Sequence, residues 1–256
     1  MNLDLSRKTI VVIGGARGIG AEVVRSCAAS GAAVAWSRLD TPADTAANRE
    51  LERELHGANR EFFSAVADCT DEAASRDFFS AIGAKWGRID GMVYCAGFTS
   101  PLDFCDISYT EWRRVVDINL NGAFLAVHCA LPLLRASGGG SIVLIGSAAV
   151  ASGGGGRADY VSAKAGLEGL SRAVTKRFAP EKIRCNIIHP SLIDTDLLKQ
   201  RHPDPAKREA LAREVPLRRL GTPSDIAAAA VFLLSEASGY ITAQSLYVDG
   251  GRSFCK

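Results

Sequence analysis

The feature that most constrains this 256-residue chain is a regular alternation of short apolar runs with longer segments of helical composition. Most of the apolar runs show little polar alternation, which is typical of strands covered on both faces. The seven predicted strands are Ile10–Ile13, Ala33–Trp36, Phe62–Val66, Gly91–Tyr94, Ser141–Ile145, Arg184–Ile188 and Ser245–Val248. The helical segments between them lie at about Gly18–Ser30, Thr45–His56, Glu72–Lys85, Tyr109–Ala136, Ala158–Ala179 and Pro223–Ser235. This order predicts an α/β fold, a doubly wound, seven-stranded parallel sheet with helices on both faces.

No linker divides the chain, so we expect residues 1–256 to form a single domain. Two segments are candidates for the border of a binding cleft. The glycine run Gly153–Gly156 is either a surface loop or a flexible cleft edge. We favour the cleft, because ligands of open α/β sheets bind beyond the carboxyl ends of the strands. Residues 195–216 are charged and punctuated by proline, which indicates a substrate lid or, alternatively, a plain insertion.

Composition argues against several function classes. The net charge is +2 with no Lys/Arg run, so we expect no nucleic-acid partner. Seven scattered cysteines form no CxxC pair and no Cys/His cluster, which indicates free thiols and no metal site. No apolar run is long enough for a signal-peptide core or a membrane span. We therefore expect a cytoplasmic protein without a membrane partner.

A glycine-rich turn at residues 14–20 (GGARGIG) follows the first predicted strand and opens the first predicted helix. Glycines there let the backbone approach a diphosphate, and the helix N-terminus offers free N–H groups and the positive end of its dipole. The spacing differs from the common Gly-x-Gly-x-x-Gly fingerprint and lacks the Gly-Lys-Ser/Thr ending of a P-loop. Its place in a β-α-β unit nevertheless predicts a dinucleotide site.

The end of the second strand distinguishes the two nicotinamide cofactors. An acid there binds the ribose hydroxyls of NAD, whereas a cation accommodates the 2′-phosphate of NADP. Arg38 follows the predicted strand directly, and Arg17 adds a second cation from the glycine turn. We therefore favour NADP, while Asp40 keeps NAD open.

Three polar residues form a candidate catalytic set. Tyr160 and Lys164 are four residues apart in a predicted helix and share one face. A nearby ammonium stabilises a phenolate, which would let a tyrosine act as acid or base near neutral pH. Ser147 ends the preceding strand, where its hydroxyl could hold a substrate oxygen. A Tyr-x-x-x-Lys spacing alone also occurs by chance in many helices.

Together with the glycine turn, this set resembles the short-chain dehydrogenase/reductase family over essentially the whole chain, from Ile10 to Gly251. The positions that match the family's motifs are Gly14, Gly18, Ile19, Gly20, Asp68, Asn119, Ser147, Tyr160, Lys164, Pro190, Thr195 and the terminal Asp249-Gly250-Gly251. The resemblance implies a Rossmann-like fold and hydride transfer between a nicotinamide and a carbonyl carbon. It also implies a homotetramer, or at least a homodimer, built on the helices at 109–136 and 158–179.

The resemblance assigns roles to the catalytic set. Tyr160 would pass the proton, Lys164 would bind the nicotinamide ribose and lower the pKa of Tyr160, and Ser147 would orient the substrate oxygen. Asn119 would hold a water in a proton relay. The residues expected to contact the cofactor are Gly14, Arg17, Gly18, Ile19, Gly20, Arg38, Asp68, Cys69, Ala96, Gly97, Tyr160, Lys164, Pro190, Ile193 and Thr195.

The chain departs from the family pattern at three places. Ile13 replaces the threonine of the glycine motif, and Ser191 replaces the glycine after Pro190. The family's Asn-Asn-Ala-Gly after the fourth strand begins here with Tyr94 and Cys95. Those asparagines mainly stabilise the central sheet, so their loss puts sheet hydrogen bonding in doubt more than chemistry. We expect His189, beside Pro190, to be a spectator rather than a proton-transfer group.

The middle of the chain and residues 216–221 resemble the 3-oxoacyl-carrier-protein reductase branch, which also contains sugar-alcohol, steroid and xenobiotic enzymes. We therefore expect an NAD(P)-dependent oxidoreductase that interconverts a secondary alcohol and a ketone, with 3-oxoacyl and polyol compounds as candidate substrates. The alternative is a non-catalytic nucleotide-binding scaffold on the same fold. Such a scaffold would be expected to have lost a catalytic residue, and all are present.

Overall fold

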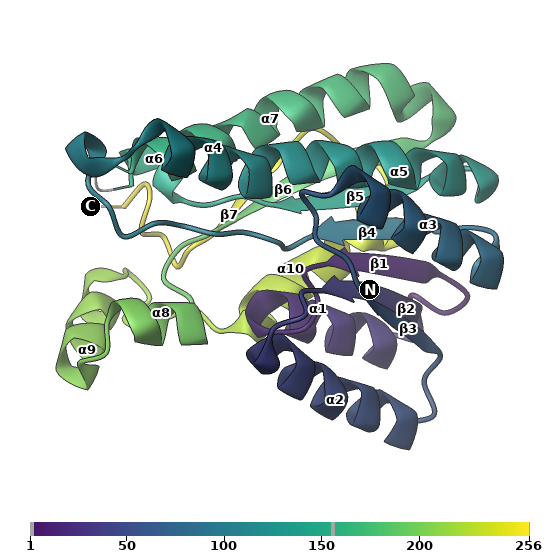
Figure 1. The fold of residues 1–256 in the computed structure, drawn as a ribbon, viewed down its shortest axis with the longest axis horizontal. Helices are drawn as coiled ribbons and strands as arrows, with labels where there is room; N and C mark the ends of the chain where they lie inside the picture. Colours follow the sequence, from purple (N-terminus) through teal and green to yellow (C-terminus); the bar gives the residue numbers. More distant parts are fainter. Residues whose placement is uncertain (1–2, 155–156, 256) are drawn as a thin grey trace.

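The computed structural model describes residues 3–154 and 157–255 and is built on one parallel sheet of seven strands (Figure 1). The strands are β1 (Thr9–Ile13), β2 (Ala33–Arg38), β3 (Phe62–Val66), β4 (Gly91–Tyr94), β5 (Gly140–Ile145), β6 (Ile183–Pro190) and β7 (Ser245–Val248). Their order across the sheet is β3-β2-β1-β4-β5-β6-β7, and every neighbouring pair is parallel. The predicted doubly wound sheet is confirmed. The order reverses between β1 and β4, which makes this the switch point where such sheets bind ligands.

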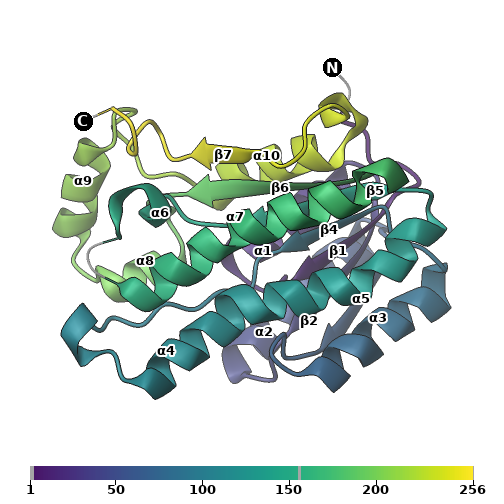
Figure 2. The same cartoon turned by 90° about the horizontal axis from the view of Figure 1, so that it is seen from above.

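Helices cover both faces of the sheet (Figures 1 and 2). The α-helices are α1 (Gly18–Ala29), α2 (Pro42–Gly57), α3 (Glu72–Trp86), α4 (Tyr109–Val116), α5 (Gly122–Ala136), α6 (Ala149–Ser152), α7 (Ala158–Phe178), α8 (Asp196–Arg201), α9 (Pro205–Glu214) and α10 (Pro223–Leu234). α1, α2 and α10 lie on one face, and α3, α5 and α7 lie on the other. α8 and α9 lie beyond the carboxyl ends of β6 and β7 (Figure 2).

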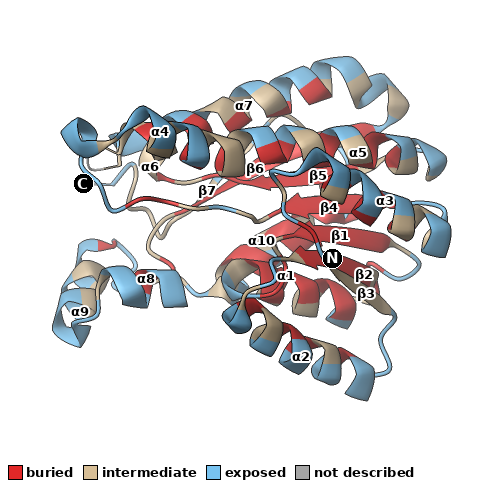
Figure 3. Cartoon of the chain, viewed as in Figure 1, coloured by how far each residue is buried: buried red, intermediate tan, exposed pale blue. Residues whose placement is uncertain are grey.

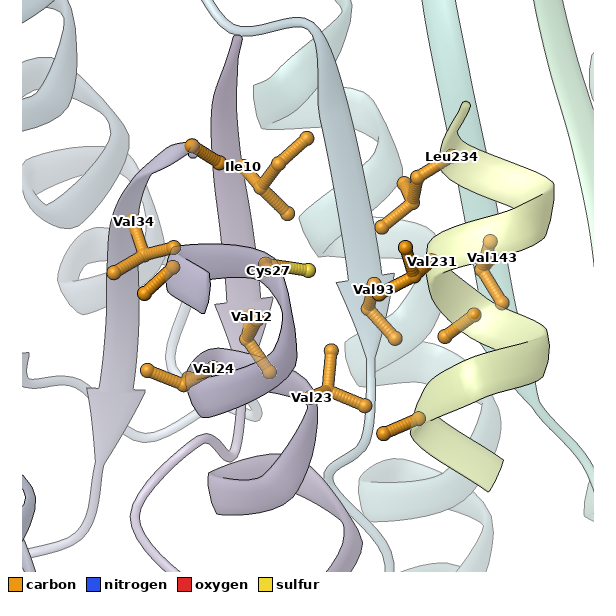
Figure 4. Packing of buried hydrophobic residues seen from close by; sticks show 14 of the residues in the cluster. Ile10, Val12, Val23, Val24, Cys27, Val34, Val93, Val143, Val231 and Leu234 are labelled. Carbon is orange, nitrogen blue, oxygen red and sulfur yellow. The ribbon is translucent and has the colours of Figure 1, made fainter. Parts of the chain in front are cut away.

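Successive residues of the central strands point to opposite faces, so each strand contributes to two hydrophobic cores. In β1, Ile10 and Val12 belong to the core under α1 and α10, whereas Val11 and Ile13 belong to the core under α3, α5 and α7. Figure 4 shows the first core, where Val23 of α1 and Val231 of α10 meet the strand residues. The inner strands β1, β2, β4, β5 and β6 are accordingly among the most completely buried parts of the molecule (Figure 3), whereas the edge strands β3 and β7 are partly exposed. Burial on both faces is why the predicted runs lacked polar alternation.

The structure differs from the predicted elements in three ways. The helical segment at 109–136 is interrupted by a π-helical turn, Asp117–Asn121, between α4 and α5. Residues 195–216 fold into α8 and α9, two short helices that composition did not indicate. β2 continues through Arg38, which pairs with Val66 of β3, so Arg38 is the last strand residue rather than the first residue after the strand.

One helical stretch, Tyr109–Ala136, is long and apolar enough to cross a membrane by length and composition. Its residues Ala123, Val127 and Leu134 are buried in the core beneath the sheet. These residues pack against the sheet as part of the hydrophobic core.

Candidate active site

An open cleft of about 1150 Å³ lies at the carboxyl ends of β4, β5 and β6. The predicted site residues that line it are Ile19, Gly97, Ser147, Tyr160, Lys164, Pro190, Ile193 and Thr195. The other predicted site residues lie beside it, at the ends of β1 to β4 and in the π-helical turn: Gly14, Arg17, Gly18, Gly20, Arg38, Asp68, Cys69, Ala96 and Asn119. Parallel strands bring segments that are far apart in the sequence to this one edge.

The proposed catalytic set converges in the cleft. Ser147 follows β5, and Tyr160 and Lys164 stand one turn apart near the start of α7. The ammonium of Lys164 is buried, donates a 2.8 Å hydrogen bond to the carbonyl of Ile145, and lies 5.8 Å from the centroid of the Tyr160 ring. Helix periodicity and the end of β5 therefore place a phenol, a hydroxyl and an ammonium in one cleft.

The protonation of this set is governed by burial and by nearby cations. Burial raises the pKa of Tyr160 and outweighs its hydrogen bond with Ser147 and the charges of Arg157 and Arg201, which lower it. The predicted lowering of this pKa by Lys164 is therefore wrong for this structure. Burial lowers the pKa of Lys164 to about 8. Both effects follow because a low-dielectric site disfavours the charged form of each group.

Asn119 is presented by the π-helical turn and is fully buried. Its side-chain amide donates to the carbonyls of Phe98 at 2.6 Å and Val115 at 2.9 Å. A Cβ added at Gly97 would lie 3.1 Å from Asn119 Oδ1 and 3.5 Å from Lys164 Nζ. Because Gly97 has no side chain, the Asn119 oxygen and the Lys164 ammonium can both lie close to its backbone.

The sheet keeps its hydrogen bonds at β4, although Tyr94 and Cys95 stand where the family has two asparagines. β4 keeps parallel ladders with β1 and β5, and the backbone N–H of Cys95 donates to Ile13 at 2.9 Å. The buried Tyr94 hydroxyl donates a 2.5 Å hydrogen bond to the carbonyl of Ile118, inside the π-helical turn. A π turn disrupts the regular helical hydrogen bonds, and here a side chain from the sheet supplies a partner.

His189 lies against the backbone of Ser147. Its ring is fully buried, its Nδ1 lies 3.0 Å from the backbone N and O of Ser147, and its Nε2 lies 3.4 Å from a carboxylate oxygen of Glu168. Gly146 makes room for the ring, because a Cβ there would lie 2.5 Å from Nδ1. Burial lowers the pKa of His189. A neutral imidazole thus contacts the backbone of Ser147, whose hydroxyl is a candidate catalytic group.

The glycine turn fits a dinucleotide phosphate. Gly14 has φ +77°, and a Cβ there would lie 2.9 Å from the backbone of Ala96. A Cβ at Gly20 would lie 2.1 Å from the carbonyl oxygen of Gly14. α1 begins after Arg17 without a side-chain cap, so its first N–H groups remain available to an anion. The turn is therefore packed so closely that only glycine fits at these positions.

The residues at the end of β2 also suit a phosphate. The Arg38 guanidinium reaches Thr45 Oγ1 at 3.3 Å and Asp40 at 3.7 Å, and its buried Nε has no partner in the structure. Arg17 is instead held in a 2.6 Å ion pair with Asp44 at the start of α2. The two predicted cations are therefore not equivalent: Arg38 has an unused donor, and Arg17 has a carboxylate partner.

The remaining predicted contacts are placed as follows. Asp68 and Cys69 follow β3, and Asp68 is exposed and accepts from the backbone of Thr70 at 2.9 Å. Thr195 lines the cleft and caps α8. Gly154 lines the cleft too, while residues 155 and 156 of the predicted glycine border lie outside the described residues.

Comparison with known proteins decides the family. The profile of a family described as enoyl-(acyl carrier protein) reductase matches residues 14–253. An L-rhamnose 1-dehydrogenase (NAD(P)(+)) from Azotobacter vinelandii is 34% identical over 245 residues, 95% of this chain and 96% of the relative. A 3-oxoacyl-[acyl-carrier-protein] reductase from Chlamydia muridarum is 36% identical over 256 residues, 98% of this chain and 99% of the relative. The chain belongs to the short-chain dehydrogenase/reductase family.

The solved structures agree with this assignment. The short-chain dehydrogenase/reductase superposes on the aldohexose dehydrogenase of Thermoplasma acidophilum with a TM-score of 0.88 at 28% identity, covering 98% of this chain and 96% of that one. The predicted family and the predicted activity class are confirmed: the protein is an oxidoreductase of alcohol and carbonyl groups, in a family that uses NAD(P). The alternative of a non-catalytic scaffold is not supported.

Proposed function

We propose that this short-chain dehydrogenase/reductase interconverts a secondary alcohol and a ketone with Tyr160 as the proton-transfer residue. The observation that carries the proposal is the convergence of Tyr160, Ser147 and Lys164 in one open cleft beside the glycine turn. A bound nicotinamide supplies or accepts the hydride at the carbonyl carbon. Tyr160 gives a proton to the carbonyl oxygen in reduction and takes one from the alcohol in oxidation.

The neighbouring residues prepare that proton transfer. Ser147 hydrogen-bonds to Tyr160 and orients the substrate oxygen, and His189 holds the backbone of Ser147. Lys164 would bind the nicotinamide ribose, and its charge would favour the phenolate of Tyr160. Asn119, fixed by the carbonyls of Val115 and Phe98, holds a relay water near Lys164.

The preferred cofactor of this proposal is NADP. Support comes from Arg38 at the end of β2, whose buried Nε lacks a partner among the residues that the structure describes. A 2′-phosphate would provide acceptor oxygens for that donor. Asp40 lies 3.7 Å from Arg38 and is mostly exposed, so it is free to turn toward solvent when a phosphate binds.

The candidate substrates are 3-oxoacyl compounds and polyols or sugars. The named activities of the relatives span both classes, a 3-oxoacyl reductase and sugar dehydrogenases. Residues 195–216 are proposed as a lid over the substrate end. The support is that Leu198, Arg201, Leu211 and Glu214, from α8 and α9, all line the cleft.

The proposed assembly is a homotetramer, or at least a homodimer, in the cytoplasm. Exposed aromatic and aliphatic side chains lie at two places that suit subunit contacts. Phe124 is 54% exposed on α5, and Tyr240, Leu246 and Phe254 are exposed around the edge strand β7. A monomer at micromolar concentration in solution would contradict this part of the proposal.

A substrate screen tests the proposed function. The purified enzyme is assayed for oxidation of NADPH and NADH with a panel of ketones and 3-oxoacyl thioesters, and for reduction of NADP and NAD with sugars and polyols. Turnover of secondary alcohol or ketone pairs with a preference for NADP(H) is expected. Absence of turnover across the whole panel, or turnover only by reduction of a C=C bond, would overturn the proposal.

A further inference from the structure

Two arginines face the proposed acid–base residue from different elements of the cleft. Arg157 directly precedes α7, and its guanidinium carbon lies 5.5 Å from the centroid of the Tyr160 ring. Arg201 is the last residue of α8. Both line the cleft together with Ser147. Neither arginine belongs to the predicted cofactor or catalytic residues.

The charges of this pair have no counter-ion in the part of the chain that the structure describes. Arg157 donates only to uncharged oxygens, the Gly154 carbonyl at 2.9 Å and Thr99 Oγ1 at 3.0 Å. No carboxylate among the described residues lies within 4 Å of Arg157 or Arg201. Arg252, a third arginine of the cleft, differs in having Glu214 at 3.5 Å.

The two like charges also act on each other. Burial and then the positive charge of Arg157 lower the pKa of Arg201, and both arginines oppose the rise that burial gives to the pKa of Tyr160. Uncompensated like charges in a partly desolvated cleft are unfavourable, and an anion between them would remove the repulsion. A planar guanidinium binds a carboxylate through two parallel hydrogen bonds.

From this juxtaposition we propose that the substrate carries a carboxylate close to the reacting carbonyl, which Arg157 and Arg201 bind, so the enzyme acts on short oxo acids and their hydroxy acids. The inference rests on the proposed function, because it takes Tyr160 as the site of reaction. In reduction, the carbonyl carbon gains a hydride from the reduced nicotinamide, which is oxidised, and the carbonyl oxygen gains the proton of Tyr160, while the carboxylate is unchanged. Arg157 and Arg201 set specificity by binding the part of the substrate that does not react.

A matched pair of substrates tests the specificity. Acetoacetate carries a carboxylate two carbons from its ketone, and methyl acetoacetate is its neutral ester. We expect the wild-type kcat/KM with NADPH to be at least about tenfold higher for the acid, because a charge-assisted hydrogen bond contributes on the order of 1.5–3 kcal/mol. An ester that reacts as well as the acid would overturn the inference.

Variants assign the preference to the two arginines. In Arg157→Gln and Arg201→Gln the ratio of acid to ester kcat/KM should fall by about tenfold. The ratio is informative because a change in the pKa of Tyr160 affects both substrates alike. Arg157→Lys keeps the charge and should retain part of the wild-type preference for the acid over the ester. Arg76→Gln, which removes an exposed arginine on α3, is the matched control and should leave the ratio unchanged.

A binding measurement separates this inference from the proposed function. Malonate and the neutral malonamide are titrated calorimetrically into the enzyme with saturating NADP. Malonate should bind at least about tenfold more tightly, and Arg157→Gln and Arg201→Gln should each remove that difference. If wild type bound malonate and malonamide equally tightly, or if both variants kept the wild-type difference in affinity between them, the inference would be overturned. If no carbonyl compound were turned over, the proposed function would fail, and the malonate titration would still decide this one.

Discussion

The hydroxyl of Tyr94, at the end of β4, donates a 2.5 Å hydrogen bond to the carbonyl of Ile118 in the π-helical turn between α4 and α5. Ile118 directly precedes Asn119, whose amide is fixed to Val115 and Phe98. The family has asparagine at the position of Tyr94. In this chain, the phenol hydroxyl of a residue in β4 therefore supports the turn that carries Asn119.

Tyr94→Phe should remove this support while keeping the ring in the core. The Ile118 carbonyl would lose a buried partner, which destabilises the fold by about 1–3 kcal/mol. We also expect kcat to fall several-fold with little change in the KM for the cofactor, because Asn119 lies on the turn. Chemical denaturation and steady-state kinetics measure the two effects. Wild-type stability together with wild-type kcat in Tyr94→Phe would refute the assigned role.

Arg38→Gln should weaken NADPH binding by at least about tenfold and change NADH binding much less, because only NADPH brings a 2′-phosphate to the end of β2. Fluorescence titration with both reduced cofactors measures the two dissociation constants. Arg49→Gln removes a charge from the exposed side of α2 and should alter neither. Wild-type enzyme that bound NADH more tightly than NADPH would contradict the cofactor preference.

His189→Phe should flatten the dependence of stability on pH between pH 7 and pH 5. Burial lowers the pKa of His189 below its ordinary value of about 6.5, so the unfolded chain binds a proton that the folded protein excludes. The wild type should therefore lose stability as the pH falls below about 6.5. Denaturation curves at several pH values test this. Equal pH slopes for wild type and variant would show that His189 is charged in the folded protein.

Lys164→Met should change how the free energy of unfolding depends on pH above neutrality. Folding lowers the pKa of Lys164 from 10.5 to about 8, so above pH 8 the folded protein has released a proton that the unfolded chain still holds. The unfolding free energy of the wild type should then rise relative to Lys164→Met by about 2 kcal/mol from pH 7 to pH 9.5. Parallel curves would mean that Lys164 titrates as an exposed lysine.

The apolar runs predicted the sheet well because its inner strands are buried on both faces. β3, β4 and β7 begin and end at the predicted residues. β2 is longer than predicted because Ser37 and Arg38 pair with β3, and pairing with a neighbouring strand extends a strand past its apolar residues. The π-helical turn was missed because it is a shift of hydrogen bonding within a continuous apolar helix pattern.

Parts of the site depend on contacts between distant segments. The parallel register pairs Ile145 with Ile188, which brings His189 beside Gly146 and Ser147. That contact was in principle predictable once β5 and β6 were taken as neighbours. The presence of Arg157 and Arg201 in one cleft was not predictable. Residues 195–216 were expected only as a lid or an insertion, and tertiary packing sets the orientation of α8.

The most direct test of the account is turnover by Tyr160→Phe, compared with wild type on any ketone that the wild type reduces. The variant keeps the ring and loses only the proton-transfer group, so kcat/KM should fall by at least about 100-fold while NADPH binding and stability stay close to wild type. Unchanged turnover in a folded variant that binds NADPH would contradict the central claim that Tyr160 transfers the proton.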